Sequence, residues 1–391
     1  MTNLPQGWEV KTLSEIGEII TGSTPSKSNV EFYGKDYPFF KPSDFEQGYF
    51  LENAGDNLSK LGFGKARQLP PKTILVVCIG SLGKVALTRV IESCNQQINA
   101  IIPHKNIISE YIYYYCISSK FQSILFSKAP QTTLAIFNKT EFSKLEIIYP
   151  KDIKEQERIV GILDFAFSKI DENIKKAKEN LANIDELMQS ALQKAFNPLN
   201  DDTKENYQLP QSWEWKSLEE ISENISAGGD KPKNCTESKT AKNQIPVYAN
   251  GVNNNGLVGY TDKATIIKPS LTISARGTIG FVCIRKEPYF PIVRLISLIP
   301  CENILCLHYL YFCLNFFIAK GEGSSIPQLT IPKFKSLQIP LPPLKEQEQI
   351  AEHLDFVFEK AKALKELYTK ELKDYEELKQ SLLDKAFKGE L

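Results

Sequence analysis

Amide, hydroxyl and cationic side chains gather in several polar loops of this chain, among them 21–29, 41–44, 231–234 and 250–255. Asn, Gln, Lys, Arg and Ser are the side chains that bind base edges or phosphate oxygens in nucleic-acid interfaces. The same residue types fill any solvated loop, so a plain surface role stays open for each of them. The candidate nucleic-acid contacts are Ser23, Thr24, Lys27, Lys41, Ser43, Lys84, Gln131, Thr132, Lys231, Lys233, Asn253, Asn254, Arg276, Ser324, Ser325 and Gln328.

Two glycine pairs with G-x-x-G spacing follow short β-like runs. Residues 79–85 read IleGlySerLeuGlyLysVal and residues 276–282 read ArgGlyThrIleGlyPheVal, aligned at an offset of 197 residues (276 − 79). Two glycines let a hairpin turn tightly between strands. Exposed backbone amides in such a turn can also cradle a phosphate. The spacing alone leaves both interpretations open.

The residues that would make this chain an enzyme are missing. There is no GxxxxGK[ST] loop, and no Ser/His/Asp order or carboxylate pair stands out. A methyltransferase acting on amino groups would need a glycine-rich cofactor turn and an Asn-or-Asp-Pro-Pro-aromatic motif. Asn197-Pro198-Leu199 lacks both the second proline and the aromatic residue. The sequence therefore predicts a non-catalytic protein with no cofactor of its own.

The cysteines and histidines do not form metal-binding patterns. Eight cysteines occur without any CxxC spacing, and His104, His308 and His353 lie far apart. This pattern indicates reduced thiols, with neither zinc nor disulfides. The start MTNLPQGWEV has no signal-peptide character, and the apolar run 304–318 is too short for a membrane span. We expect a cytoplasmic protein with no membrane partner and no small-molecule substrate, in which 304–318 forms a buried helix.

The formal net charge is zero, with 47 basic and 47 acidic residues, but the charge is unevenly distributed. Residues 151–196 and 343–391 carry 17 Lys/Arg against 21 Asp/Glu, which leaves 30 against 26 in the rest of the chain (47 − 17 and 47 − 21). The remainder is thus modestly basic, as a phosphate-binding surface requires. A surplus of four is too small to hold a polyanion tightly unless it is focused on one face or supplemented by partner subunits.

The chain repeats itself. Residues 4–16 match 209–221 at nine of thirteen positions, offset by 205 (209 − 4), and residues 154–169 match 345–360 at ten of sixteen, offset by 191 (345 − 154). The segment between these blocks is therefore fourteen residues shorter in the second copy (205 − 191), whereas the block after it keeps its length. A chain duplicated in this way is built to hold two similar units at a fixed separation.

The constant part of each half is predicted to be a long helix. Apolar residues recur in steps of three and four over 159–195 and 350–386, which places one stripe along each helix. Asp152 and Glu155 resemble a capping box, and Pro343 suits a first helical turn. Roughly forty residues at about 1.5 Å per residue give a rod of about 60 Å.

Two such rods with matching stripes should pair in antiparallel fashion, with the two variable parts at opposite ends. Two independent core helices are the alternative, which does not explain the equal, gap-free lengths. The predicted fold class is α+β, with two mixed α/β domains separated by two long antiparallel helices that form a coiled coil, in a pseudo-twofold internal repeat. The predicted boundaries are 1–150 for the first variable domain, 151–197 for the first helix, 198–342 for the second variable domain and 343–391 for the second helix.

Both halves of the chain carry the same motifs in the same order, and this pattern resembles the specificity subunit of type I restriction-modification enzymes. The pattern is a Trp-containing start (LPQGWE, LPQSWE), a strand ending in Gly-x-x-Gly, and KEQE-x-I opening a long helix. TGSTP (21–25) and CysAsnGlnGlnIleAsnAla (94–100) are similar to segments common in the family's target-recognition domains. The second half carries IleProValTyrAlaAsnGly (245–251) instead, so the two domains are expected to read different sequences.

The resemblance implies a DNA-recognition subunit that binds a bipartite double-stranded site, one element per variable domain, with the helices fixing the unread spacer. It also implies two docked modification methyltransferase subunits, which carry S-adenosylmethionine and methylate adenine, and restriction subunits that join with ATP and Mg for cleavage. Two near-identical helix starts suit two identical partners. The candidate docking residues are Glu155, Gln156, Asp164, Phe165, Glu346, Gln347, Asp355 and Phe356.

Two other interpretations stay open at this point. The docking candidates are equally compatible with a solvated helix face that carries local side-chain pairs. The whole chain is also compatible with a non-catalytic coiled-coil scaffold that joins two protein-binding domains. Enrichment of a bipartite motif from random duplexes would distinguish DNA recognition from the scaffold.

Overall fold

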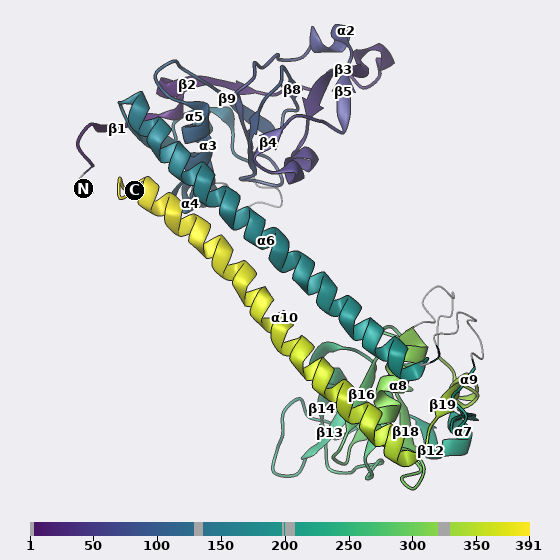
Figure 1. The fold of residues 1–391 in the computed structure, drawn as a ribbon. Helices are drawn as coiled ribbons and strands as arrows, with labels where there is room; N and C mark the ends of the chain where they lie inside the picture. Colours follow the sequence, from purple (N-terminus) through teal and green to yellow (C-terminus); the bar gives the residue numbers. More distant parts are fainter. Residues whose placement is uncertain (1–3, 129–135, 198, 200–207, 320–328) are drawn as a thin grey trace. The chain divides into compact units, whose positions relative to one another are not determined.

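The computed structural model describes residues 4–128, 136–197, 199, 208–319 and 329–391. Contacts divide the chain into two compact units, Met1–Ala177 with Lys370–Leu391, and Lys178–Thr369. Each unit holds one mixed α/β domain and a part of each long helix, α6 (Ile153–Phe196) and α10 (Leu344–Ala386) (Figure 1).

Three sheets and several short helices build the domain of the first unit. Its strands are β1 (Trp8–Thr12), β2 (Gly17–Thr21), β3 (Tyr33–Phe40), β4 (Phe50–Leu51), β5 (Asp56–Leu58), β6 (Ile74–Val77), β7 (Val85–Thr88), β8 (Ser93–Cys94), β9 (Ile98–Pro103) and β10 (Glu146–Pro150). Its helices are α1 (Leu13–Ile16), η1 (Val30–Phe32), η2 (Pro42–Gln47), α2 (Lys60–Phe63), α3 (Ser109–Ile117), α4 (Ser119–Lys128) and α5 (Lys139–Ser143). The sheet orders are β2-β9-β6-β7-β4, β5-β3-β8 and β1-β10.

The second unit uses the same plan. Its strands are β11 (Glu214–Ser217), β12 (Ser222–Ala227), β13 (Ile245–Tyr248), β14 (Leu257–Thr261), β15 (Ser270–Ile273), β16 (Val282–Arg285), β17 (Phe290–Pro291), β18 (Ile296–Pro300) and β19 (Gln338–Leu341). Its helices are α7 (Leu218–Ile221), η3 (Asn253–Gly256), α8 (Leu307–Ala319) and α9 (Ile331–Lys335). The sheet orders are β12-β18-β15-β16, β14-β13-β17 and β11-β19.

The two domains correspond sheet by sheet. The order β12-β18-β15-β16 repeats β2-β9-β6-β7 without the edge strand β4, and β14-β13-β17 repeats β5-β3-β8. In both three-stranded sheets the middle strand pairs antiparallel with one neighbour and parallel with the other. Each domain ends in a strand that leads into a helix of more than forty residues. The predicted fold class and internal repeat are confirmed.

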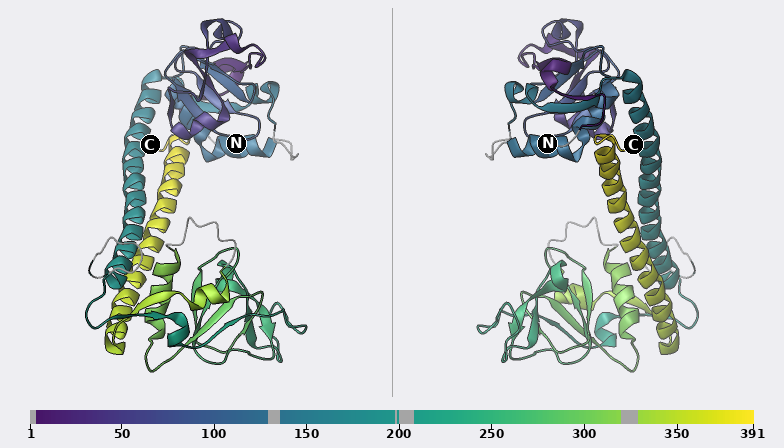
Figure 2. Two further views of the ribbon diagram at one scale, coloured as in Figure 1. Left: turned by 90° about the vertical axis from the view of Figure 1, so that its right-hand side faces the viewer. Right: turned by 90° about the vertical axis from the view of Figure 1, so that its left-hand side faces the viewer.

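Within each unit, the segments of α6 and α10 run antiparallel (Figure 2). In the first unit, Lys379 of α10 forms an ion pair with Asp171 of α6 at 2.5 Å. In the second unit, Lys365 of α10 pairs with Asp185 of α6. The two pairs are fourteen residues apart along each helix (185 − 171 and 379 − 365), so a single antiparallel register accounts for both.

The predicted apolar stripes are the buried faces of these helices. On α6, Ile159, Leu163 and Ile170 are at most 5% exposed, and the other predicted stripe positions of this helix are buried or half-buried. Burial of such a stripe is what stabilises a long amphipathic helix. On α10, Leu364 and Leu378 are the exceptions, with 41% and 46% of their surface exposed.

The apolar run 304–318 contributes most of α8, as predicted. This helix packs in the core of the second unit, where Tyr309, Leu310 and Leu314 are fully buried. Across the described residues, the helices include none with the length and apolarity needed to cross a bilayer.

Candidate nucleic-acid interface and partner surface

Both Gly-x-x-Gly segments are the tips of antiparallel hairpins. Gly80 and Gly83 lie between β6 and β7 with φ of +82° and +86°, and Gly277 and Gly280 lie between β15 and β16 with φ of +68° and +85°. In each tip the second glycine N–H donates back to the preceding strand segment at 2.9 Å. Glycine is required because left-handed φ values are unfavourable for other residues. The hairpin interpretation is confirmed, and the phosphate-cradling role stays a prediction.

Two lysines predicted to contact nucleic acid lie close together in the first domain. Lys27 is exposed on the loop after β2, and Lys41 follows β3. Burial lowers the pKa of Lys41, and the positive charge of Lys27 lowers it further. Lys41 also forms an ion pair with Asp56, so part of its charge is already neutralised. These two ammonium groups form the cationic part of a polar surface.

Ser23 and Thr24 belong to the same polar surface, together with two residues that were not among the candidates. The Thr24 hydroxyl donates to Oε1 of Gln96 at 2.5 Å. The backbone N–H of Arg67 donates to the Ser23 hydroxyl at 3.3 Å. Gln96 belongs to the Asn-Gln-Gln segment that supported the family resemblance, so the sequence did contain a signal that could have identified it. Arg67 had no local signal, because its loop meets Ser23 only through the fold.

Ser43 and Lys84 stand apart from this group. Ser43 is exposed on η2. Lys84 follows the hairpin tip and forms an ion pair with Glu46 at 2.5 Å. Lys84 and Glu46 also line a cavity of about 580 Å³ together with Asp164 of α6. A lysine that already holds a carboxylate binds a phosphate less strongly, which applies to Lys84 as it does to Lys41.

The described candidates of the second domain are all exposed. Lys231 and Lys233 lie on the loop after β12, Asn253 and Asn254 lie in η3, and Arg276 begins the β15–β16 hairpin tip. Asn254 adopts a left-handed backbone with φ of +48°, a conformation that asparagine tolerates better than most residues.

Asn250, which sequence reasoning passed over, joins the loops of the second domain. Its Oδ1 accepts from the N–H of Ala275, the residue before Arg276, at 2.8 Å. Its Nδ2 donates to the Val293 carbonyl at 2.6 Å. One side chain thus links the loop after β13, the hairpin tip and the turn before β18. Its segment, 250–255, was named as a polar loop, but nothing in the sequence identified the two partners of Asn250.

Five candidates, Gln131, Thr132, Ser324, Ser325 and Gln328, lie outside the described residues.

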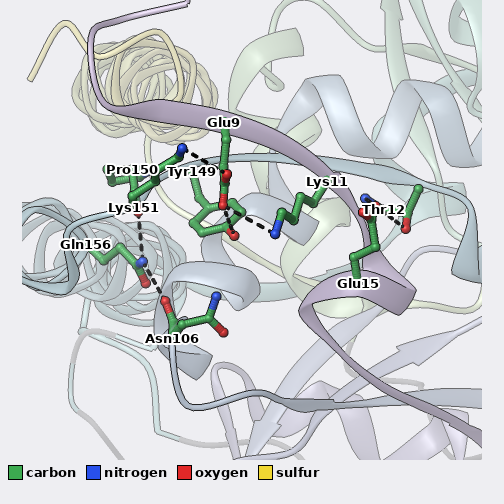
Figure 3. Close-up of polar contacts among 9 residues, drawn as sticks. All are labelled: Glu9, Lys11, Thr12, Glu15, Asn106, Tyr149, Pro150, Lys151 and Gln156. Carbon is green, nitrogen blue, oxygen red and sulfur yellow. Dashed lines mark hydrogen bonds and ion pairs between the residues drawn. The ribbon is translucent and has the colours of Figure 1, made fainter.

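The two glutamines of the KEQE motifs are internal anchors, which corrects their assignment to a partner surface. Gln156 is fully buried; its Oε1 accepts from Ile108 N–H at 3.0 Å, and its Nε2 donates to the carbonyls of Asn106 and Pro150 at 3.2 and 2.9 Å (Figure 3). Because all three partners are backbone groups of the domain, the amide ties the helix start to the domain. No part of this side chain is left for another protein.

Gln347 repeats this arrangement in the second unit. It is fully buried, its Oε1 accepts from Cys306 N–H at 2.9 Å, and its Nε2 donates to the carbonyls of Ile304 and Pro342 at 2.9 and 2.8 Å. The helical period places position 3 of each KEQE motif on the face toward the domain, whereas the glutamate that follows it, Glu157 or Glu348, is exposed.

The acidic docking candidates already have partners within this chain. Glu155 binds the Arg158 guanidinium through both oxygens at 2.7 and 2.8 Å, and this contact lowers the pKa of Glu155. Asp164 accepts from the Tyr114 hydroxyl at 2.6 Å. Glu155 therefore fits the local-pair interpretation, whereas the partner of Asp164 belongs to α3 of the domain.

Their counterparts in the second unit are paired as well. Glu346 accepts from Nε1 of Trp213 at 3.0 Å, and Asp355 contacts Nδ1 of His308 at 2.7 Å. Asp152 caps α6 through a hydrogen bond from Lys154 N–H, at the second helical position, at 3.0 Å, so the predicted cap is present with a different partner from that of a capping box.

Phe165 and Phe356 are the candidates best placed to contact another molecule. They occupy equivalent positions on α6 and α10 (356 − 165 = 191) and are 69% and 60% exposed. Each directly follows a paired aspartate, Asp164 or Asp355. Large aromatic side chains left exposed at repeated positions mark interaction surfaces more often than solvated ones. Among the described residues, no cluster of His, Cys, Asp and Glu has the geometry of a metal site.

The chain contains two copies of one mixed α/β domain, and a buried glutamine ties each copy to the long helix that follows it. The described part of the chain shows no evident catalytic centre. Such a duplicated architecture is typical of a recognition protein. The chain belongs to the family of the type I restriction modification DNA specificity domain, whose model matches residues 5–183 and again residues 210–373.

Individual relatives agree with this assignment. The specificity subunit of the type I restriction enzyme HindI of Haemophilus influenzae is 40% identical over 176 residues, which are 44% of this chain and only 38% of that protein. The MjaIX specificity subunit of Methanocaldococcus jannaschii is 24% identical over 392 residues, covering 91% of this chain and 88% of that protein.

Solved structures share the fold. A chain from a study of assembly and conformational transition of the type I R-M system matches over 100% of both chains, with a TM-score of 0.82 and 20% identity. The HsdS subunit from Thermoanaerobacter tengcongensis matches over 99% of this chain and 98% of that chain, with a TM-score of 0.61 and 20% identity.

Proposed function

We propose that this chain is the DNA-recognition subunit of a type I restriction-modification complex and that each domain reads one element of a bipartite double-stranded site. One observation carries the proposal. Both units have the same fold, the same buried glutamine and the same long helix, whereas the exposed side chains on corresponding loops differ. The first domain presents Thr24 with Gln96 and Lys27, and the second presents Asn253, Asn254 and Arg276. Conserved scaffolds with different polar loops suit two different sequences.

The charge distribution sets the mode of binding. The part outside the two long helical segments has a surplus of only four basic residues, and Lys41 and Lys84 are already paired with carboxylates. Phosphate contacts supply most of the affinity of DNA-binding proteins. The chain alone should therefore bind DNA weakly and with a shallow salt dependence, and partner subunits should contribute most of the phosphate contacts.

Two equivalent surfaces around Phe165 and Phe356 suit the docking of two identical methyltransferase subunits. Each surface combines an exposed phenylalanine with a neighbouring aspartate on the first turns of a long helix. A pseudo-twofold subunit presents the same patch twice, so two copies of one partner can bind in equivalent ways. In this assembly S-adenosylmethionine, ATP and Mg belong to partner subunits, and this chain is non-catalytic.

The experiment is selection from a random duplex pool by the full-length chain, with and without the methyltransferase subunit of its host. We expect a bipartite motif with a constant spacer, and stronger enrichment when the methyltransferase is present. Recovery of unselected sequences under both conditions, together with stable capture of another protein, would favour the scaffold instead.

A further inference from the structure

A turn occupies the same place in both domains. It spans 95–98, which leads into β9, and 292–295, which leads into β18. In each domain, a glycine that follows the first strand of the larger sheet, Gly22 or Gly228, donates its N–H to the carbonyl of the last turn residue, at 3.0 and 2.8 Å. Each turn is also closed by a hydrogen bond across it, at 3.2 and 3.0 Å. The hydrogen bonds that hold the turn are therefore equivalent in both domains.

The glycines bring the turn against the polar loops. A Cβ on Gly22 would lie 2.1 Å from the carbonyl oxygen of Asn95, and a Cβ on Gly228 would lie 2.6 Å from the backbone nitrogen of Ile292. Such distances exclude any side chain at these positions. The loops that carry Thr24 and Lys27 in one domain, and Lys231 in the other, therefore start in direct contact with the turn.

The side chains of this turn differ between the domains. In the first domain the exposed residue is Gln96, which accepts from Thr24, whereas Gln97 is tied inward by a hydrogen bond to the Ile79 carbonyl at 3.3 Å. In the second domain, Val293 and Arg294 are both exposed. The two turns thus share their closing hydrogen bonds but not their backbone conformation, since only the second has left-handed central residues. Their exposed side chains change from an amide to a valine and a guanidinium.

The second turn also has a strained backbone. Val293 and Arg294 have φ of +54° and +60°, although neither is glycine and valine is β-branched. Such a pair persists only where surrounding contacts hold it, and strained residues of this kind gather at binding sites. Here Asn250 donates to the Val293 carbonyl at 2.6 Å, and Arg294 N–H donates to the Gly228 carbonyl at 2.9 Å. These contacts hold the Arg294 backbone in one orientation.

We propose that this turn is the base-reading element of each domain and that Arg294 reads a guanine in the element bound by the second domain. The proposal rests on the proposed DNA-recognition function. The guanidinium fork matches O6 and N7 of guanine in the major groove. In the described part of the chain, no carboxylate pairs with Arg294, so its donors are available. Asn250 acts as a positioning residue.

The test is selection from the random duplex pool with the full chain, its methyltransferase, and the variants Arg294→Ala, Arg294→Lys and Asn250→Ala. We expect Arg294→Ala to lower the preference for guanine at one position of one element at least tenfold and to leave the other element unchanged. Asn250→Ala should weaken the preference at that same position. Lys286→Ala removes an exposed cation at the opposite end of the β15–β16 hairpin and should leave the motif intact.

Three results would overturn the inference. An unchanged motif with Arg294→Ala would show that the turn does not read bases. A uniform loss of affinity over all sequences would assign Arg294 to phosphate binding. If the wild-type chain itself enriches no motif, the proposed function fails, and this outcome is distinct from the other two.

Discussion

At the scale of single residues, a buried glutamine amide connects each long helix to its domain, although its neighbours in the sequence are polar. Gln156 lies in a strongly polar stretch, KEQER, yet it satisfies three backbone groups from segments up to 50 residues away. A buried N–H or C=O that loses its partner costs about 1–3 kcal/mol. Gln347 does the same in the second unit. These glutamines attach the helices to their domains.

Gln156→Ala should therefore destabilise the first unit by about 2–4 kcal/mol, because three buried backbone groups lose their partner at once. Thermal unfolding, combined with hydrogen exchange at the Ile108 amide, would measure this change. The control is Gln349→Ala, which removes an exposed glutamine from a helix start and should have little effect. Equal losses for the two variants would contradict an anchoring role.

A second residue-scale prediction concerns Glu92, which is fully buried. Among the described residues, neither of its carboxylate oxygens has a well-formed hydrogen bond, and the nearby Thr88 hydroxyl donates to the Thr73 carbonyl at 3.3 Å. Burial raises the pKa of Glu92 well above its usual value of 4.5. The folded state therefore keeps a proton that the unfolded chain releases as the pH rises above about 4.5.

The contribution of Glu92 to stability is thus full below about pH 4.5 and falls as the pH rises toward its folded-state pKa. Glu92→Gln keeps the shape of the protonated acid without the ionisation. We expect melting temperatures close to wild type at pH 4.5 and higher than wild type at pH 8. Glu31→Gln, at an exposed position, serves as the control. Parallel pH profiles for wild type and Glu92→Gln would refute the buried-acid argument.

At the scale of elements, α6 and α10 share one antiparallel register in both units, as the pairs Asp171–Lys379 and Asp185–Lys365 show. Their lengths of 44 and 43 residues correspond to about 65 Å each at about 1.5 Å per residue. A register that is kept over two heptads resists slipping, because every buried stripe position would have to move together.

Removing one heptad from 170–190 of α6 and one from 361–381 of α10 should shorten the spacer of the recognised site and leave both half-sites unchanged. Seven residues correspond to about 10 Å of helix, or about three base pairs. Sequencing of methylated sites in a host that carries the variant would give the spacer length. Altered half-sites would show that the helices do more than set the distance.

A second prediction at this scale tests the proposed docking surfaces around Phe165 and Phe356. Phe165→Glu places a charge on an exposed apolar contact and should reduce the bound methyltransferase from two copies to one, and Phe356→Glu should do the same at the other surface. The double variant should bind none. Native mass spectrometry or light scattering of the purified complex would count the copies. Val30→Glu alters an exposed apolar residue of the first domain and should leave two copies bound. Two copies on the double variant would place docking elsewhere.

At the scale of the whole molecule, the chain contains the same domain-and-helix unit twice, with different exposed side chains on the loops. Replacing residues 1–150 with the corresponding domain of a relative should therefore change one half-site only, because the second domain has its own core and its own glutamine anchor. Methylated-site sequencing would reveal the new motif. A change in both half-sites would mean that the two domains do not read independently.

Much of this architecture could be predicted because its signals are repeated and local in the chain. The steps of three and four over 159–195 predicted a long helix, which the structure places at Ile153–Phe196, and the hairpin interpretation of the Gly-x-x-Gly pairs is confirmed. Side-chain roles were harder to predict. Gln156 was assigned to a partner surface because its helix start is repeated in the second half, and Arg67 was missed because it meets Ser23 across 44 residues of chain.

The sequence by itself determined the duplication, the two long helices and the kind of chemistry on the loops, since periodicity and residue type are properties of short segments. Only the tertiary structure decided which of those residues act together. Two of the three partners of Gln156 lie about 50 residues away, and Asn250 holds Ala275 and Val293 from a hairpin tip and a turn that the chain reaches later. Hydrogen bonds between distant segments depend on how strands and helices pack, and single-residue patterns do not encode that packing.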